Sequence, residues 1–83
     1  MTARPDHGRQ IAAARAILRL TLDDLAKLSG LHKQSIVYNE RKGRFPRHAH
    51  AAKRMGEALE PLGVSFETRK DGYAVVFKDT PPV

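Results

Sequence analysis

The feature that most constrains the fold is a pair of short helical patterns joined at a glycine. Apolar residues recur at helical spacing on both sides of Gly30. Thr21 and Asp24 make a variant of the capping box at the start of the first pattern. Glycine enters the left-handed conformation without the penalty of about 1 kcal/mol or more that other residues incur. The sequence therefore predicts a helix over residues 22–29, a sharp turn, and a helix over residues 33–41.

A period of 3.6 residues sorts the side chains of both helices into faces. The first helix is expected to bury Leu25, Ala26 and Leu28. The second is expected to turn Leu31, Ile36 and Glu40 inward, with Asn39 beside them. The outward face of this second helix is rich in hydrogen-bond donors and consists of Lys33, Gln34, Val37, Tyr38 and Arg41.

Two more helices are expected to flank this pair, so that residues 8–62 form one helical domain. The first spans residues 8–20, is capped by Asp6, and buries Ile11, Ala14 and Leu18. The last spans residues 47–60, begins after a loop marked by Gly43 and Pro46, and buries Ala51, Ala52, Met55 and Leu59. Residues 1–7 carry no apolar period, which predicts a flexible N-terminal arm.

After Pro61 the apolar period changes from 3.6 to 2, which predicts a β-hairpin over residues 63–78. A two-residue turn places Phe66 opposite Phe77, whereas a four-residue loop places it opposite Val75. Either register leaves one apolar face, made of Val64, Phe66, Tyr73, Val75 and Phe77. Residues 79–83, with two prolines, are expected to be a disordered tail. The fold class is thus mainly α, with four helices and a C-terminal β-hairpin.

The apolar face of the hairpin has two possible roles. A lone hairpin is marginal in water, so this face must pack on something. It covers the helical core, or it pairs with its copy in a second chain, and both can hold at once. We expect a homodimer in which the dimerising residues are Phe66, Val75 and Phe77.

Charge is the next constraint on function. The formal net charge of +6 is concentrated between Leu31 and Gly56, where seven Lys and Arg residues face Glu40 alone. Such a cluster repels itself, and a phosphate backbone relieves that repulsion with release of counterions. The alternative is a solvated surface that merely aids solubility.

Several classes of protein are disfavoured by composition. Without cysteine the 83-residue chain has no disulfide, no thiolate zinc site and no thiol nucleophile. No apolar run approaches the roughly 20 residues that span a bilayer, and the N-terminus lacks a secretory signal. His48 and His50 differ by two positions, about 200° around a helix, so they do not form a metal pair. We expect a cytoplasmic protein with no enzymatic activity, cofactor, metal or membrane partner.

The run LTLDDLAKLSGLHKQSI over residues 20–36, with Glu40 and Arg41 after it, resembles the helix-turn-helix of the Cro and phage-repressor family, also called XRE. The resemblance covers roughly Ile11 to Val64. Leu25, Ala26, Gly30, Ile36 and Glu40 at the intervals of the family give it most of its specificity. It implies a lambda-repressor-like fold and a sequence-specific DNA-binding protein, usually a dimeric transcriptional repressor, with the helix over residues 33–41 in the major groove.

The same resemblance assigns roles to individual residues. Base edges are assigned to Lys33, Gln34, Val37 and Tyr38, because glutamine pairs with adenine, lysine donates to guanine and valine touches a thymine methyl. The alternative for these residues is an ordinary solvated helix face. Phosphate contacts, which position without reading sequence, are assigned to His32, Ser35, Arg41, Lys42, Arg44 and Arg47.

Four residues receive structural roles. Arg15 and Glu40 match a salt bridge between the first and third helices of the family. Ala26 is small where two helices cross closely, and Gly30 makes the turn.

Two residues depart from the family pattern. Asn39 stands where an apolar residue is usual, so it either bonds to loop backbone or marks a slightly rotated helix. His32 stands where a hydroxyl residue normally caps the helix, which predicts a weaker cap.

We therefore expect a nucleoid-associated regulator of bacterial or phage type that represses its own or a neighbouring promoter. Its partner is expected to be a palindromic double-stranded DNA operator with half-sites ~34 Å apart. Two alternatives belong to other classes. One is an antitoxin that keeps this motif and also binds a small protein partner. The other is an architectural accessory protein that bends DNA with little sequence preference.

Overall fold

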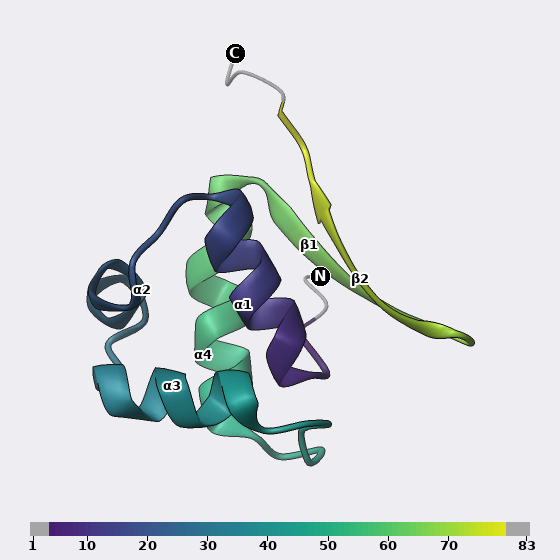
Figure 1. The fold of residues 1–83 in the computed structure, drawn as a ribbon, viewed down its shortest axis with the longest axis horizontal. Helices are drawn as coiled ribbons and strands as arrows, with labels where there is room; N and C mark the ends of the chain where they lie inside the picture. The colour runs from purple at the N-terminus through teal and green to yellow at the C-terminus, as the bar shows by residue number, and fades with distance from the viewer. Residues whose placement is uncertain (1–3, 80–83) are drawn as a thin grey trace.

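A computed structural model describes residues 4–79 of the chain. Helices surround one apolar core and a hairpin lies across it (Figure 1). The elements are α1 (Gly8–Ile17), α2 (Leu22–Ser29), α3 (Lys33–Arg41), α4 (His50–Leu59), the 3₁₀ turn η1 (Glu60–Leu62), β1 (Val64–Arg69) and β2 (Gly72–Phe77). This order confirms the expected mainly α architecture with a C-terminal β-hairpin.

The residue that caps α1 lies one position after the predicted one. The N-cap is His7, not Asp6: the Nδ1 atom of His7 accepts from the Arg9 amide at 3.1 Å, and Gln10 Oε1 accepts from the His7 amide at 3.0 Å. The carboxylate of Asp6 instead accepts a hydrogen bond from the Thr68 hydroxyl on the hairpin. A tertiary contact thus removes the better capping residue from the helix end.

α1 also ends three residues before the predicted position 20. Arg19 adopts φ 58°, in the left-handed region. The amides of Arg19 and Leu20 donate to the carbonyls of Ala16 and Arg15 at 3.1 and 2.9 Å, which is the Schellman pattern. This stop was missed because the left-handed position usually carries glycine, and an arginine there costs roughly 1–2 kcal/mol.

The described part of the predicted arm is packed, not flexible. Pro5 is fully buried, and a Cβ placed at Gly56 of α4 would lie 2.8 Å from its ring. His7 forms an isolated β-bridge with Arg44, in which Gly8 donates to the Gly43 carbonyl at 3.1 Å. The arm prediction therefore fails for residues 4–7, because a ring and a backbone bridge hold them; residues 1–3 lie outside the described chain.

α2 and α4 each depart from prediction in one detail. In α2, Leu28 is 50% exposed while Ser29 is buried, because the inward stripe runs through Leu22, Leu25, Ala26 and Ser29 at spacings of three and four. α4 begins at His50 and not at residue 47. The preceding residues form a turn in which the Ala49 amide donates to the Pro46 carbonyl at 3.2 Å.

The core contains one loop residue that neither helical nor strand periodicity could supply. Phe45, from the loop between α3 and α4, is 5% exposed and belongs to the same buried cluster as side chains from all four helices and β1. The other buried apolar residues are Ile11, Ala14, Leu25, Ile36, Ala52, Met55, Leu59, Val64 and Phe66.

The hairpin adopts the second of the two registers, with Phe66 opposite Val75. Its connection is shorter than a four-residue loop, because Arg69 pairs with Gly72 and leaves Lys70 and Asp71 as the turn. Val64 and Phe66 are buried, whereas Tyr73 and Phe77 are each 41% exposed. Phe66 was expected to dimerise, and this is wrong: it fills the core of its own chain.

Gln10 ties the hairpin to the start of α1. Its Nε2 group donates to the carbonyls of Glu67 and Ala74 at 3.1 and 3.0 Å, one on each strand. Its Oε1 atom accepts from the amides of Asp6 and His7 at 2.7 and 3.0 Å. Gln10 is only 3% exposed, so four hydrogen bonds satisfy a buried amide group. The orientation of the hairpin on α1 is fixed by this contact as well as by apolar packing.

Candidate nucleic-acid interface

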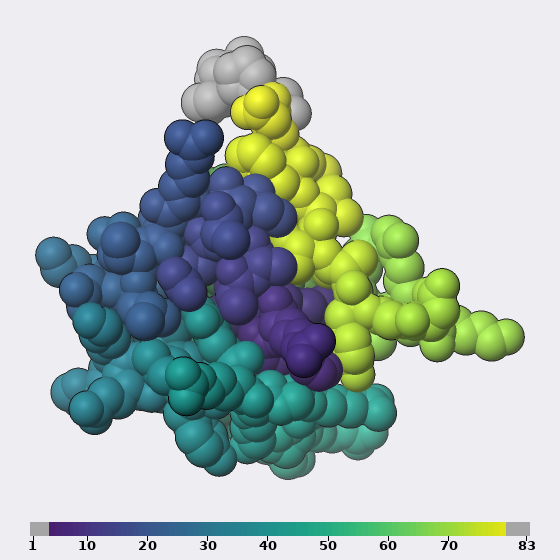
Figure 2. All heavy atoms as spheres, in the orientation of Figure 1, coloured from purple at the N-terminus to yellow at the C-terminus, as the bar shows by residue number. Residues whose placement is uncertain are grey.

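The outer face of α3 consists of Lys33, Gln34, Val37, Tyr38 and Arg41, as the sequence predicted. Four of these side chains are exposed and Val37 is half-buried. Tyr38 is 64% exposed, more than any other large apolar or aromatic residue in the described part of the chain. In Figure 2 the atoms of α3 and the following loop form a continuous teal band along the lower side of the molecule. The four predicted base-contacting residues therefore share one open surface.

A shallow hollow of about 370 Å³ lies on this surface. It is lined by Gln34, Val37, Tyr38, Arg41 and Lys42. The Nζ atom of Lys42 lies 5.6 Å from the centroid of the Tyr38 ring, within the range of a cation–π contact. Lys33 does not line the hollow, and its Nζ atom lies 3.6 Å from the Asp23 carboxylate on α2. Both partners are largely exposed, so this pair is weak and a stronger anion can displace it.

The inner face of α3 is anchored to α1 by an ion pair. The Arg15 guanidinium donates from Nε to Glu40 Oε2 at 2.8 Å and from a terminal nitrogen to Oε1 at 3.1 Å. Its other terminal nitrogen donates to the Leu20 carbonyl at 3.1 Å. The hydrogen bond to Glu40 raises the pKa of Arg15 above its ordinary value. The predicted bridge is confirmed, and the charge of Glu40 is neutralised inside the fold.

Backbone contact fixes the far end of α3. A Cβ placed at Gly8 would overlap the carbonyl oxygens of Asn39 and Lys42, and would lie 2.7 Å from that of Glu40. Asn39 is 7% exposed, and its Nδ2 group donates to the Ser35 carbonyl at 2.7 Å. Asn39 thus bonds within α3 and not to loop backbone. Ser35 is half-buried beside it, and its Oγ atom accepts from Asn39 Nδ2 at 3.4 Å, which leaves the hydroxyl hydrogen free to donate.

The other predicted phosphate residues gather at the C-terminal end of α3 and in the loop after it. Arg41, Arg44 and Arg47 are exposed, and Lys42 is half-buried. Within residues 4–79, none of these four side chains forms a salt bridge. The backbone of Arg44 is held by its bridge to His7, so the cations are free while the chain that carries them is fixed.

The turn into α3 also matches expectation. Gly30 has φ 73°, and its amide donates to the Ala26 carbonyl at 2.9 Å to close α2. Ala26 is half-buried and packs against the core, and α2 is in contact with both α3 and α4. His32 is the N-cap of α3 but makes no capping hydrogen bond, and the first turn of α3 carries no acid. The first amides of α3 are left without a side-chain partner.

One basic feature escaped the sequence analysis. Arg4, Arg47, His48, His50 and Lys53 line a hollow of about 220 Å³ beside the start of α4. Arg4 reaches it because its guanidinium donates to the Pro46 carbonyl at 3.0 Å, across 42 positions of sequence. Periodicity gives no signal for such a contact. The basic surface is therefore wider than the segment from Leu31 to Gly56 alone.

In the part of the chain that the structure describes, no group of three or more His, Asp or Glu side chains is arranged to hold a metal ion. Nor is any helix within residues 4–79 long and apolar enough to cross a bilayer. Comparison with protein-family models, with curated proteins and with solved structures finds no match to this chain. The resemblance to the Cro and phage-repressor family rests on the residues quoted for it and stays a prediction.

Proposed function

We propose that the protein binds double-stranded DNA with α3 in the major groove and acts as a transcriptional repressor of the Cro and phage-repressor type. The observation that carries this proposal is the contrast within α3. Its inner face is tied to α1, while its outer face offers an amide, a lysine, a phenol and an arginine to solvent. Glutamine and lysine are side chains that distinguish base pairs by hydrogen bonding in the major groove.

The loop after α3 supplies the complementary electrostatic contacts. Arg41 ends the outer face, and Lys42, Arg44 and Arg47 follow it in sequence. No acid of residues 4–79 forms a salt bridge with any of these four side chains. Phosphate contacts of this kind fix the register of a helix on the duplex. Each neutralised phosphate also contributes about 0.9 to the slope of affinity against salt. The proposed role of these cations is therefore to hold α3 in position.

The test begins by selecting bound fragments from a random pool of duplexes. Binding of Gln34→Ala and Arg44→Ala is then measured on the selected site and on random DNA over a salt series. Gln34→Ala is expected to cost ~1 to 3 kcal/mol on the selected site and to relax its selectivity. Arg44→Ala is expected to weaken binding to every duplex and to reduce the salt slope by ~0.9.

Lys70→Ala is the charge-matched control. It also removes one exposed cation, but Lys70 lies in the turn between β1 and β2 and not in α3 or the loop after it. It should leave the salt slope nearly unchanged. Equal losses on selected and random DNA for both Gln34→Ala and Arg44→Ala would contradict the assignment. A selection that enriches no sequence would favour an architectural DNA-binding protein instead.

A further inference from the structure

The hollow beside the start of α4 gathers basic side chains from three segments of the chain. Its volume is about 220 Å³, and its wall consists of Arg4, Arg47, His48, Ala49, His50 and Lys53. Arg4 comes from the segment before α1, and its guanidinium donates to the Pro46 carbonyl at 3.0 Å. No acidic side chain among residues 4–79 lines the hollow. Three permanent cations and two histidines therefore share one small space.

The two histidines meet in this hollow only because α4 begins late. On one continuous helix, residues two positions apart would point about 200° away from each other. α4 begins at His50, however, and His48 lies in the turn before it. Within residues 4–79, neither imidazole forms a hydrogen bond or a salt bridge. Both rings are thus exposed and available to a ligand.

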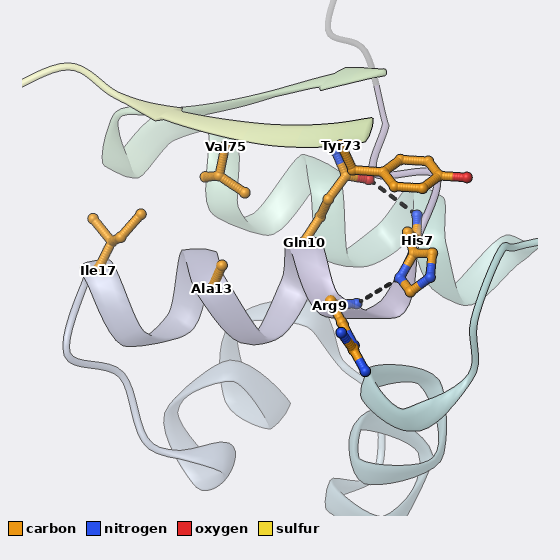
Figure 3. Close-up of a pocket in the computed structure, with 7 residues that line it drawn as sticks. All are labelled: His7, Arg9, Gln10, Ala13, Ile17, Tyr73 and Val75. Carbon is orange, nitrogen blue, oxygen red and sulfur yellow. Dashed lines mark hydrogen bonds between the residues drawn. The ribbon is translucent and has the colours of Figure 1, made fainter. Parts of the chain in front are cut away.

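The groove between α1 and β2 differs from this hollow in both respects (Figure 3). Its volume is about 440 Å³, and Ile17 and Val75 contribute an apolar wall. The His7 imidazole that lines it is already engaged, because Nδ1 accepts from the Arg9 amide and the ring centroid lies 4.8 Å from that of Tyr73. A concentration of cations with unengaged imidazoles therefore distinguishes the hollow at α4 from this groove.

A phosphate in the hollow favours the charged form of both imidazoles. Histidine changes charge between about pH 5 and 8, and an opposite charge within about 4–6 Å favours the protonated ring. Arg4, Arg47 and Lys53 attract the same phosphate throughout this range. Arg54 is not part of the set, since its guanidinium lies against Gly30, 2.8 Å from the position of a Cβ there. Binding of phosphate and of protons is thus coupled, and each strengthens the other.

The acids of the neighbouring elements leave this positive charge largely uncompensated. Asp6 has its carboxylate 3.9 Å from Arg4 Nε, and it also accepts from the Thr68 hydroxyl. Glu57 on α4 stands seven positions beyond His50, roughly 10 Å along the helix axis, and η1 lies farther still. The acids of α2, α3 and β1 bond to residues outside the hollow, and they are Asp23, Asp24, Glu40 and Glu67.

We infer that the hollow binds a backbone phosphate of the duplex proposed to hold α3, and that His48 and His50 take up protons as it binds. The inference rests on the proposed function for the source of the phosphate. Arg47 joins the two surfaces, because it lines the hollow and also belongs to the row of cations that follows α3. A continuous phosphate backbone can follow that row into the hollow. Affinity for the duplex therefore rises as pH falls.

The first experiment measures the Kd for the selected duplex from about pH 8 to about pH 6 at constant ionic strength. The proteins are wild type, the double variant His48→Gln with His50→Gln, and His32→Gln. The wild-type Kd should fall about fivefold or more over this range, because each proton adds a charge that contacts phosphate. The Kd of the double variant should change by less than about twofold, since glutamine does not titrate. Circular dichroism checks that each variant is folded.

His32→Gln is the matched control. It also replaces an exposed imidazole, but His32 lies at the N-cap of α3 and does not line the hollow. This variant should keep the fall in Kd. A pH response that disappears in His32→Gln and persists in the double variant overturns the inference.

Calorimetry gives a second readout. Heats of duplex binding in two buffers with different ionisation enthalpies, at about pH 6.5, report the number of protons taken up. The wild type should take up about one proton or more, and the double variant close to none. Uptake that is equal in the two proteins overturns the inference.

Inorganic phosphate distinguishes two sources of the ligand. Millimolar phosphate should weaken duplex binding no more than chloride of equal ionic strength does. A stronger effect of phosphate that the double variant lacks would assign the hollow to a free phosphate and overturn the duplex contact.

The same measurements separate this inference from the proposed function. Selective binding of one sequence with no dependence on pH would overturn the inference and leave the function in place. Duplex binding that depends on His48 and His50 but is indifferent to sequence and to Gln34→Ala would support the phosphate contact and contradict a sequence-specific repressor. Absence of binding to any duplex would overturn both.

Discussion

The two faces of α3 use similar side chains in opposite ways. On the inner face, Asn39 bonds to the Ser35 carbonyl and Glu40 holds the Arg15 guanidinium, so polar groups are satisfied within the chain. On the outer face, the Gln34 side chain makes no hydrogen bond within residues 4–79, and the Lys33 side chain has one weak exposed partner. The difference teaches that exposure and lack of partners, more than residue type, mark the surface available for a ligand.

The largest effect is expected from Gly8→Ala, which attacks the packing behind α3. The new methyl would overlap backbone carbonyls of Asn39 and Lys42, which cannot rotate away as a side chain can. We expect the free energy of unfolding to fall by about 3 kcal/mol or more, because overpacking against backbone forces α1 and α3 apart. Urea denaturation followed by circular dichroism measures this.

Gly72→Ala is the matched control for Gly8→Ala. Nothing lies within 4 Å of a Cβ at Gly72, and its φ is not positive. Its effect on stability should stay within about 0.5 kcal/mol. If Gly8→Ala lowers the free energy of unfolding no more than Gly72→Ala does, α1 and α3 do not approach as closely as described.

Glu40→Ala should cost about 2 kcal/mol, because it leaves the Arg15 guanidinium partly buried without its carboxylate. The double variant Arg15→Leu with Glu40→Leu should cost less than the two single changes added together, since no unpaired charge remains. Denaturation of the wild type, Arg15→Leu, Glu40→Leu and the double variant gives this coupling. Strictly additive losses would mean that the pair does not anchor the inner face.

His32→Ser should stabilise the protein by about 0.5 to 1 kcal/mol. A serine hydroxyl at the N-cap accepts from an amide of the first turn, which His32 does not do. His48→Ser is the control, because His48 precedes the N-cap of α4 and cannot cap it. The thermal midpoints of both variants test whether the N-terminus of α3 lacks a capping hydrogen bond. If His32→Ser raises the midpoint no more than His48→Ser does, that description of α3 is wrong.

The smallest effect concerns Asp24, in the capping box of α2. Hydrogen bonds with Thr21, first with its backbone amide, lower the pKa of the Asp24 carboxyl below its ordinary 3.8. A lowered folded pKa adds stability above the ordinary value, and this is lost as pH falls through the folded value. Asp24→Asn should therefore flatten the fall in stability below about pH 4. Asp23→Asn, on the same turn, serves as the comparison.

Much of the fold followed from local pattern. α2 and α3 were predicted within their observed bounds, since the capping box, Gly30 and the apolar spacing all act over a few residues. The outer face of α3 followed for the same reason. The link between Arg15 and Glu40 came from family resemblance, because nothing in local spacing brings two residues 25 positions apart together.

The sequence by itself determined where helices alternate with strands and which side of α3 stays exposed, because period and capping depend on neighbours along the chain. Tertiary structure alone decided that Asp6 bonds to Thr68 instead of capping α1, that Gln10 holds both strands, and that Phe66 fills the core. It also chose the register with Phe66 opposite Val75. These outcomes depend on contacts between segments far apart in sequence, whose energies no local pattern contains.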